Sequence, residues 1–223
     1  FMTTTLYSSS NLTLGDNFGR NPNRYYLEEY FKRKPGLNAD IQNSAESTRM
    51  IANPDFEVLG TNASDDDITY SATHAGILMT LDGSSNDSII ILPHLDTNQS
   101  AWTNVKWGTE NQVEWACAIT TGSAIATQSI WAGLKLTNTY VIGTDNDQAY
   151  FLYSTNSSLT TSANLHFVYS VGGTDYVTDL GLALATSTTY QLRIVVDSDR
   201  KLKVYVNNKQ YGVVTTASST GGS

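Results

Sequence analysis

The chain has 223 residues, with 13 Lys and Arg against 21 Asp and Glu and a formal net charge of −8. This length suits one large β-sandwich, and the surplus of acids argues against a nucleic-acid groove and against docking on anionic lipid. No apolar stretch approaches the ~18 residues of a membrane-spanning helix, so we expect neither nucleic acid nor membrane among the partners.

The charge is unevenly distributed along the chain. Residues 50–192 hold only Lys106 and Lys135 against fourteen acids, whereas residues 193–223 carry a net charge of +3. Charged residues make up 15% of the chain, and Ser, Thr, Asn and Gly are abundant. This composition favours a protein of the virion surface or the extracellular space. Cys117 has no partner for an intrachain disulfide, and we expect it to be a buried apolar side chain.

Residues 24–34 are expected to form a short helix, because Pro22 precedes them and Pro35 follows them. Four side chains follow the i, i+1, i+4, i+5 spacing of one aromatic helix face, namely Tyr26, Leu27, Tyr30 and Phe31. This face either covers an edge of the sandwich or docks on a neighbouring subunit. We therefore interpret residues 1–50 as an N-terminal arm. The candidates for subunit contact are Arg24, Tyr26, Tyr30, Phe31 and Arg33.

From residue 55 onward apolar and polar residues alternate, and about a dozen short strands are expected between turn residues. They cover residues 56–60, 68–70, 76–81, 88–93, 113–119, 129–136, 148–153, 164–171, 176–180, 190–196 and 201–206. The pattern predicts an all-β fold, a two-sheet antiparallel jelly-roll sandwich over residues 51–217. Residues 218–223 are expected to be a flexible tail, and one or both ends of the sequence to be incomplete.

Two hairpins are evident in this pattern. One turns at Gly172 and Gly173, which accept the positive φ of a tight turn. The other joins residues 190–196 to residues 201–206. Each of its strands has one apolar face, made of Tyr190, Leu192, Ile194 and Val196 on the first and of Leu202, Val204 and Val206 on the second.

The second hairpin resembles the closing part of concanavalin A-like lectin and glucanase jelly rolls, a superfamily that includes laminin G modules. The similar residues are Tyr-Gln-Leu-Arg-Ile-Val-Val-Asp at 190–197 and Tyr-Val-Asn-Asn at 205–208, where Asn208 replaces the usual Gly. The resemblance covers about 25 residues and implies a fold, because this jelly roll hosts lectins, glycosidases, adhesion modules and virion proteins. The chain also resembles, in style, structural proteins of tailed bacteriophages that join an extended arm to a jelly roll.

One stretch resembles a catalytic motif of the same superfamily. The stretch is similar to the Glu-x-Asp-x-Glu motif of family 16 glucanases, and this chain has Glu110, Gln112 and Glu114 at the three named positions. The amide of Gln112 cannot supply the charge that tunes the two glutamates in such a site. We therefore expect two solvent-facing glutamates, no catalytic residue and no enzymatic activity.

Tryptophans and acidic turns are the remaining candidates for binding sites. Trp115 and Trp131 lie in apolar strands and are expected in the core, whereas Trp102 and Trp107 lie in a polar loop and are candidates for carbohydrate contact. The carboxylate oxygens of Asp145 and Asp147 suit Ca²⁺, but clusters of Asp and Asn are also common in ordinary turns. We expect no cofactor and no metal, with Ca²⁺ at these two residues as the alternative.

Together these features favour a non-enzymatic virion structural protein, either a capsid decoration or cement protein or a fibre component. It would assemble through its N-terminal arm with other virion subunits, as a homo-oligomer. The alternative is a lectin-like module that binds a glycan. A family 16-like glucanase is the third hypothesis.

Overall fold

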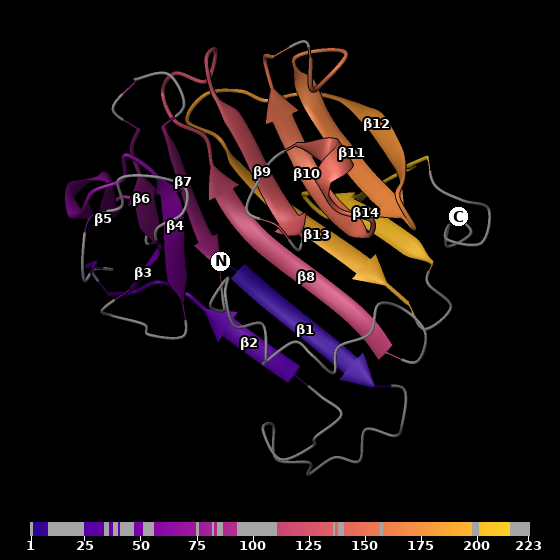
Figure 1. The fold of residues 1–223 in the computed structure, drawn as a ribbon, viewed down its shortest axis with the longest axis horizontal. Helices are drawn as coiled ribbons and strands as arrows, with labels where there is room; N and C mark the ends of the chain where they lie inside the picture. The colour runs from indigo at the N-terminus through magenta and orange to yellow at the C-terminus, as the bar shows by residue number, and fades with distance from the viewer. Residues whose placement is uncertain are drawn as a thin grey trace. The chain divides into compact units, whose positions relative to one another are not determined.

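The structure is a computed structural model that describes residues 2–8, 25–33, 36–37, 40, 47–50, 56–74, 76–81, 83, 87–92, 111–135, 137, 141–156, 158–197 and 201–214. The strands in these ranges pair in antiparallel sheets, as the alternating pattern predicts (Figure 1). The all-β class is confirmed.

The chain divides into two compact units. Unit 1 consists of Phe1–Glu29 and Val105–Ser223, and unit 2 consists of Tyr30–Asn104. Unit 2 is therefore a continuous insertion in the sequence of unit 1. The expected boundary between an arm and a sandwich at residue 50 remains a prediction.

Unit 1 contains a six-stranded sheet in the order β15-β14-β13-β8-β1-β2. Its strands are β1 (Met2–Ser8), β2 (Tyr25–Glu29), β8 (Asn111–Thr120), β13 (Thr189–Val196), β14 (Leu202–Val206) and β15 (Lys209–Tyr211). Buried residues alternate with accessible ones along β13 and β14, which confirms both apolar faces of the predicted hairpin. Val113 and Trp115 of β8 are also buried.

A four-stranded sheet in the order β12-β11-β10-β9 forms the other layer of unit 1. Its strands are β9 (Ser129–Leu134), β10 (Gln148–Ser154), β11 (Asn164–Val171) and β12 (Thr174–Ala183). β10 contacts β13 and β9 contacts β8, and Figure 1 shows β9 to β12 in front of β13 and β14. This arrangement of two antiparallel sheets is compatible with a β-sandwich.

The two central strands of the four-stranded sheet are covered on both faces, because β10 is buried along its whole length and β11 at residues 165–170. On one face the rings of Phe151 and Phe167 pack edge to face with their centroids 5.2 Å apart. The opposite face carries Tyr150, Leu152 and Val168 under a partial apolar cover of Trp131, Ile142 and Leu159. This second face holds most of the polar side chains considered below.

Two tight turns have successive positive φ values, and the sequence predicts the first of them. Gly172 and Gly173 join β11 to β12 with φ values of 56° and 80°. Asn207 and Asn208 join β14 to β15 with φ values of 50° and 64°. Two successive positive φ values match the right-handed twist of a hairpin, and both Gly and Asn tolerate them.

The helix expected over residues 24–34 is wrong. Tyr25–Glu29 form strand β2, which pairs with β1 so that Met2 lies opposite Glu29 and Leu6 opposite Tyr25. The aromatic spacing fits one face of a helix, but pairing with a distant strand decides the local structure. The strand ends before Phe31, which adopts a φ of 48°.

Unit 2 is built from shorter strands. A three-stranded sheet has the order β3-β4-β7, with β3 at Ser47–Arg49, β4 at Glu57–Thr61 and β7 at Ser88–Leu92. The 3₁₀ turn η1 (Asp65–Asp67) precedes a hairpin of β5 (Ile68–Tyr70) and β6 (Ile77–Met79). Phe56, Val58, Leu59 and Ile68 are buried in this unit. In the residues that can be described, no helix is long and apolar enough to cross a membrane.

Candidate functional site

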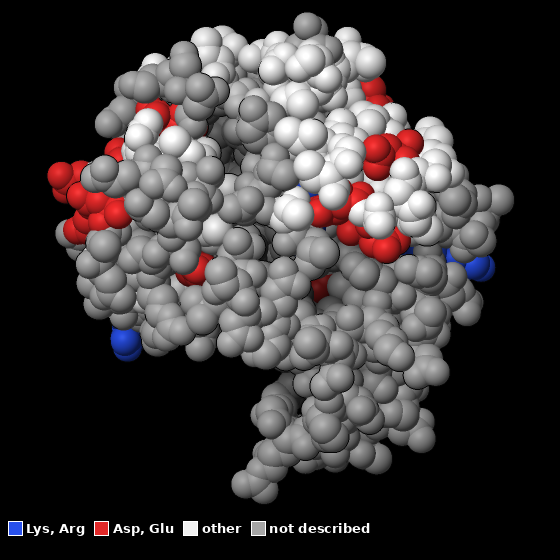
Figure 2. All heavy atoms as spheres, viewed as in Figure 1, with Lys and Arg blue, Asp and Glu red and all other residues white. Residues whose placement is uncertain are grey.

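One face of the four-stranded sheet concentrates polar side chains, and we call it the polar face. Strand register sets three rows across it. The first row joins Gln148, Ser170 and Asp175, the second joins Tyr150, Val168 and Val177, and the third joins Leu152, His166 and Asp179. Figure 2 shows acidic side chains gathered over this part of the molecule. Two polar clusters therefore flank a central apolar row.

Lys135 is the centre of the first cluster. It follows directly after β9, and its ammonium group lies 2.7 Å from Asp145 Oδ2 and 2.9 Å from both Gln148 Oε1 and Thr144 Oγ1. The side chains of Lys135 and Asp145 are only 1% and 2% exposed. Three close oxygen acceptors match the three N–H groups of an ammonium ion, so this buried charge is well satisfied.

The carboxyl group of Asp145 is held in its charged form. Burial alone would raise its pKa, but the hydrogen bond and charge of Lys135 and the N–H and hydroxyl of Thr137 hold the pKa below its usual value. An ammonium ion therefore already binds the oxygen that the sequence offered as a Ca²⁺ ligand. The other candidate, Asp147, accepts the backbone N–H of Gly172 at 3.2 Å.

The same cluster fastens a loop to the sheet. Gln148 Nε2 donates to the carbonyl of Ile142 at 2.5 Å and to Ser170 Oγ at 2.8 Å, and Ser170 donates to Asp175 at 2.6 Å. Ile142 belongs to the 3₁₀ turn η3 (Ile142–Thr144). The backbone N–H of Gly173 donates to the carbonyl of Asn146 at 2.9 Å. Residues 141–147 are thus tied to β10, β11 and the β11–β12 turn.

Asp179 is the centre of the second cluster. Its carboxylate accepts hydrogen bonds from Ser162 Oγ at 2.7 Å, from Asn164 Nδ2 at 3.1 Å and from the N–H of Gly181 at 2.7 Å. The Ser162 and Gly181 donors lower its pKa, and Asn164 and the charge of His166 add to the effect. Nδ1 of the buried His166 lies 2.9 Å from the carbonyl of Asn164, and its Nε2 lies 3.9 Å from Asp179 Oδ2.

This arrangement differs from a nucleophile relay. In a Ser-His-Asp triad the imidazole lies between the hydroxyl and the carboxylate, and it accepts the hydroxyl proton. Here Ser162 donates directly to Asp179, and the imidazole of His166 lies to one side. The cluster lies at the irregular start of β11, where the register with β12 shifts between Leu165 and His166.

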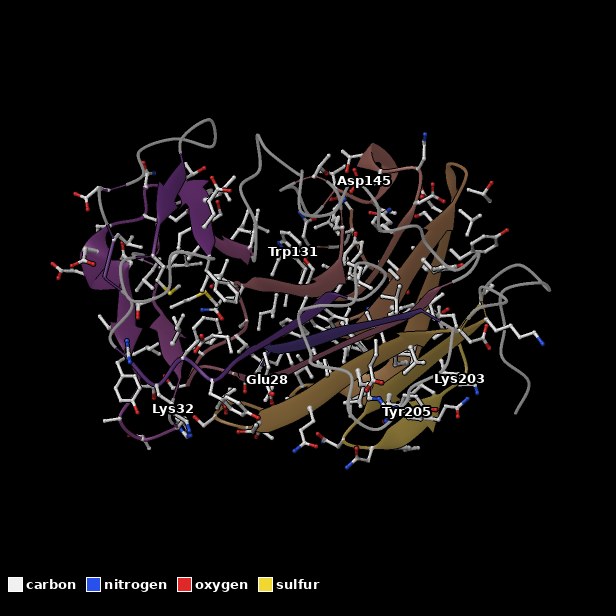
Figure 3. All side chains as sticks on the ribbon, turned by 90° about the horizontal axis from the view of Figure 1, so that it is seen from below. Glu28, Lys32, Trp131, Asp145, Lys203 and Tyr205 are labelled. Atoms are coloured by element: carbon white, nitrogen blue, oxygen red, sulfur yellow. The ribbon has the colours of Figure 1, made fainter. Side chains whose placement is uncertain are left out.

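The glutamate of the glucanase-like stretch lies on the other sheet. Glu114 Oε1 is 2.9 Å from Arg193 Nε, and the guanidinium carbon of Arg193 lies 4.9 Å from the centre of the Tyr205 ring. The Nε contact is an ion pair without the angle of a hydrogen bond. Figure 3 shows Asp145 and Tyr205 on opposite sides of unit 1. Glu110 lies outside the described residues.

The structure describes only some of the residues that the sequence predicts to contact a glycan or a neighbouring subunit. Trp102, Trp107 and Arg24 lie outside the described residues, and so does the side chain of Tyr26. Tyr30 and Arg33 are exposed, and the ring of Phe31 packs edge to face on Phe56 at 5.1 Å. Trp115 is buried as expected, whereas Trp131 is only partly buried and packs edge to face on Tyr150.

The single cysteine, Cys117, is partly exposed, whereas the sequence predicts a buried side chain. Desolvation of the thiol by the surrounding residues raises its pKa to about 12, so the thiol stays protonated at neutral pH and is a poor nucleophile. Among the residues that the structure describes, no group of three or more His, Cys, Asp or Glu side chains could hold a metal ion.

The role of Lys135 as the centre of a buried cluster is missing from the expectations drawn from the sequence. One signal points to it, because Lys135 directly follows an apolar strand and is one of only two cations in residues 50–192. A lysine in such a place needs a buried counter-charge. Comparison of the chain with family models, curated proteins and solved structures gave no match.

Proposed function

We propose that this protein is a non-enzymatic structural subunit of a larger assembly, a virion component that decorates or cements a capsid or forms part of a fibre. Its body would be a concanavalin A-like jelly roll displayed on the virion surface or outside the cell. Copies of the chain, or the chain and other virion subunits, would bind through protein surfaces.

The polar face supports this proposal, because its carboxylates are engaged by groups of the same chain. The carboxylates of Asp145, Asp175 and Asp179 each accept hydrogen bonds from neighbouring groups of the same chain. A glycosidase needs a carboxyl group whose raised pKa lets it act as an acid. The pKa values of Asp145 and Asp179 are lowered instead. These contacts favour a rigid scaffold over a reaction centre.

The native mass of the purified chain tests the proposal. Light scattering and direct imaging at ~10–100 µM should give a particle of several subunits with regular symmetry. A monomer throughout this concentration range would contradict it. Deleting residues 1–50 is too coarse a test, because β1 lies beside β8 and the deletion would remove two strands of the six-stranded sheet.

A lectin-like module is the second candidate, and the position of Trp131 favours it. This indole is partly exposed on the polar face, in the same row as His166 and Asp179. An indole beside hydrogen-bonding groups suits the stacking of a sugar ring. Binding on a glycan array that Trp131→Ala removes, while the melting temperature is kept, would support this candidate. If the chain binds nothing on the array, the glycans that the array carries are excluded as ligands.

A further inference from the structure

Exposed apolar side chains gather on the β5–β6 hairpin of unit 2. Tyr70, Met79 and Leu81 are between 38% and 51% exposed. Tyr70 pairs with Ile77, so Tyr70 and Met79 share one face of the hairpin, and Leu81 follows Met79 by two residues, whereas the exposed Leu78 points to the opposite face. We call Tyr70, Met79 and Leu81 the hairpin patch. Apolar groups gathered in this way are typical of a surface that binds a partner.

The surroundings of the hairpin patch are acidic. Asp65, Asp66 and Asp67 form the turn η1 directly before β5, and Thr80 N–H donates to the carbonyl of Asp67 at 2.9 Å. Residues 51–104 contain eight acids and neither Lys nor Arg. A partner that buries the patch therefore needs apolar or aromatic groups together with positive charge.

The chain itself contains a segment of this chemistry. Residues 30–33 are Tyr-Phe-Lys-Arg, and we call them the basic segment. Tyr30, Lys32 and Arg33 are exposed, and the Lys32 ammonium lies 5.2 Å from the centre of the Tyr30 ring. Among the described residues neither Lys32 nor Arg33 forms an ion pair. Figure 3 shows Lys32 at an edge of unit 2.

The basic segment is held in place by its own unit. The ring of Phe31 packs on Phe56, and a few residues later the N–H of Leu37 donates to Asp65 Oδ1 at 2.8 Å. In this anchored position the hairpin patch and the cations of the basic segment are all exposed. The two surfaces therefore do not cover each other within one chain.

We propose that the hairpin patch of one copy binds the basic segment of a second copy. This inference rests on the proposed function as an assembly subunit and names the surfaces through which it assembles. If the two reciprocal pairs form between the same two copies, the assembly is a closed two-fold dimer. If one pair forms at each contact, the assembly is head to tail and closes into a ring or continues as a filament, according to the rotation between neighbouring copies.

Two variants, each of which lacks one surface, test the pairing. The hairpin variant carries Met79→Thr and Leu81→Thr, and the basic-segment variant carries Lys32→Glu and Arg33→Glu. Each alone should be a monomer by sedimentation velocity, with association weakened at least about tenfold. An equal mixture should form a 1:1 heterodimer, because one variant keeps an intact patch and the other keeps an intact segment.

Matched controls separate the contact from general effects of charge and stability. Lys201→Glu with Lys203→Glu makes the same charge change in unit 1, and Val177→Thr removes an exposed apolar side chain from β12. Both should assemble like the unmodified chain. Unchanged circular dichroism and melting temperature should accompany all the variants.

Three outcomes would overturn the inference, and they differ in what they mean for the proposed function. If the hairpin variant assembles normally, the inference fails while the proposed function stands. If both variants are monomers and their mixture is also monomeric, the pairing of the hairpin patch with the basic segment fails. If the unmodified chain is a monomer at ~100 µM, the inference and the proposed function fail together.

Discussion

At the scale of single residues, Lys135 offers the sharpest test of the polar face. Lys135→Met keeps most of the apolar stem but leaves the Asp145 carboxylate buried without its counter-ion. Removing one partner of a buried pair costs about 3–5 kcal/mol. We expect the free energy of unfolding in urea to fall by that amount.

The control for this prediction is Lys203→Met, on a half-buried lysine of β14 for which no ion pair is found within the described residues. It should change the free energy by no more than about 0.5 kcal/mol. Adding Asp145→Asn to Lys135→Met should recover part of the loss, because the stranded charge is gone. A loss below about 1 kcal/mol in Lys135→Met would contradict the role of the cluster.

The lowered pKa of Asp145 predicts a loss of stability in acid. A group whose pKa is lower in the folded chain stabilises the fold above its unfolded pKa of about 3.9, and this contribution is lost as the pH falls through the folded pKa. We expect the unmodified chain to exceed Asp145→Asn in free energy of unfolding at pH 7, and the difference to shrink below about pH 4. Urea unfolding from pH 7 to pH 2.5 measures this difference. A constant difference across the range would contradict the prediction.

At the scale of elements, the pairing of β9 with β10 depends on Gly133. Its φ is 154°, and a Cβ atom there would lie 2.5 Å from the Cα of Tyr150 in the neighbouring strand. Gly133→Ala must therefore displace the backbone of β10, and we expect it to destabilise the fold by about 2–4 kcal/mol. Thermal unfolding should show a melting temperature lower by about 5 °C or more. Gly212→Ala, where nothing lies within 4 Å of the added Cβ, is the matched control and should be neutral.

The strands of unit 1 were largely predictable because local signals agree there. In β13 and β14, strict alternation places Leu192, Ile194 and Val204 on one buried face, as the sequence predicts. Turn residues agree with this pattern, since Gly172 and Gly173 have the positive φ that their hairpin needs. Where alternation and turn chemistry indicate the same structure, a single sequence is informative.

The errors lie where distant residues decide the structure. Nothing near Tyr25 indicates that Leu6 will lie opposite it in a sheet, so the aromatic spacing favoured a helix. Likewise, the sequence around Asp145 leaves Ca²⁺ only as an alternative and does not indicate its partner Lys135, which lies ten residues away across a loop. Pairing over such separations follows from the folded sheet and leaves no periodic signal in the sequence.

At the scale of the whole molecule, the two units are expected to differ in local stability. Unit 1 has long central strands such as β10 and β11 that are buried on both faces. In unit 2, β5 and β6 have three residues each and form a two-stranded sheet. A two-stranded hairpin has little stability of its own. We expect the amides of β5 and β6 to exchange hydrogen through local opening, while those of β10 and β11 exchange only on global unfolding.

Hydrogen exchange measured by mass spectrometry, on the Lys32→Glu, Arg33→Glu variant, tests this difference without protection from self-association. Salt provides a second readout. The eight acids of residues 51–104 repel one another with no cation among them, and raising the salt concentration from ~0.05 M to ~0.5 M screens that repulsion. Exchange in β5 and β6 should therefore slow with salt more than exchange in β10. Equal protection of the two units, with the same response to salt, would mean that they open as one cooperative body.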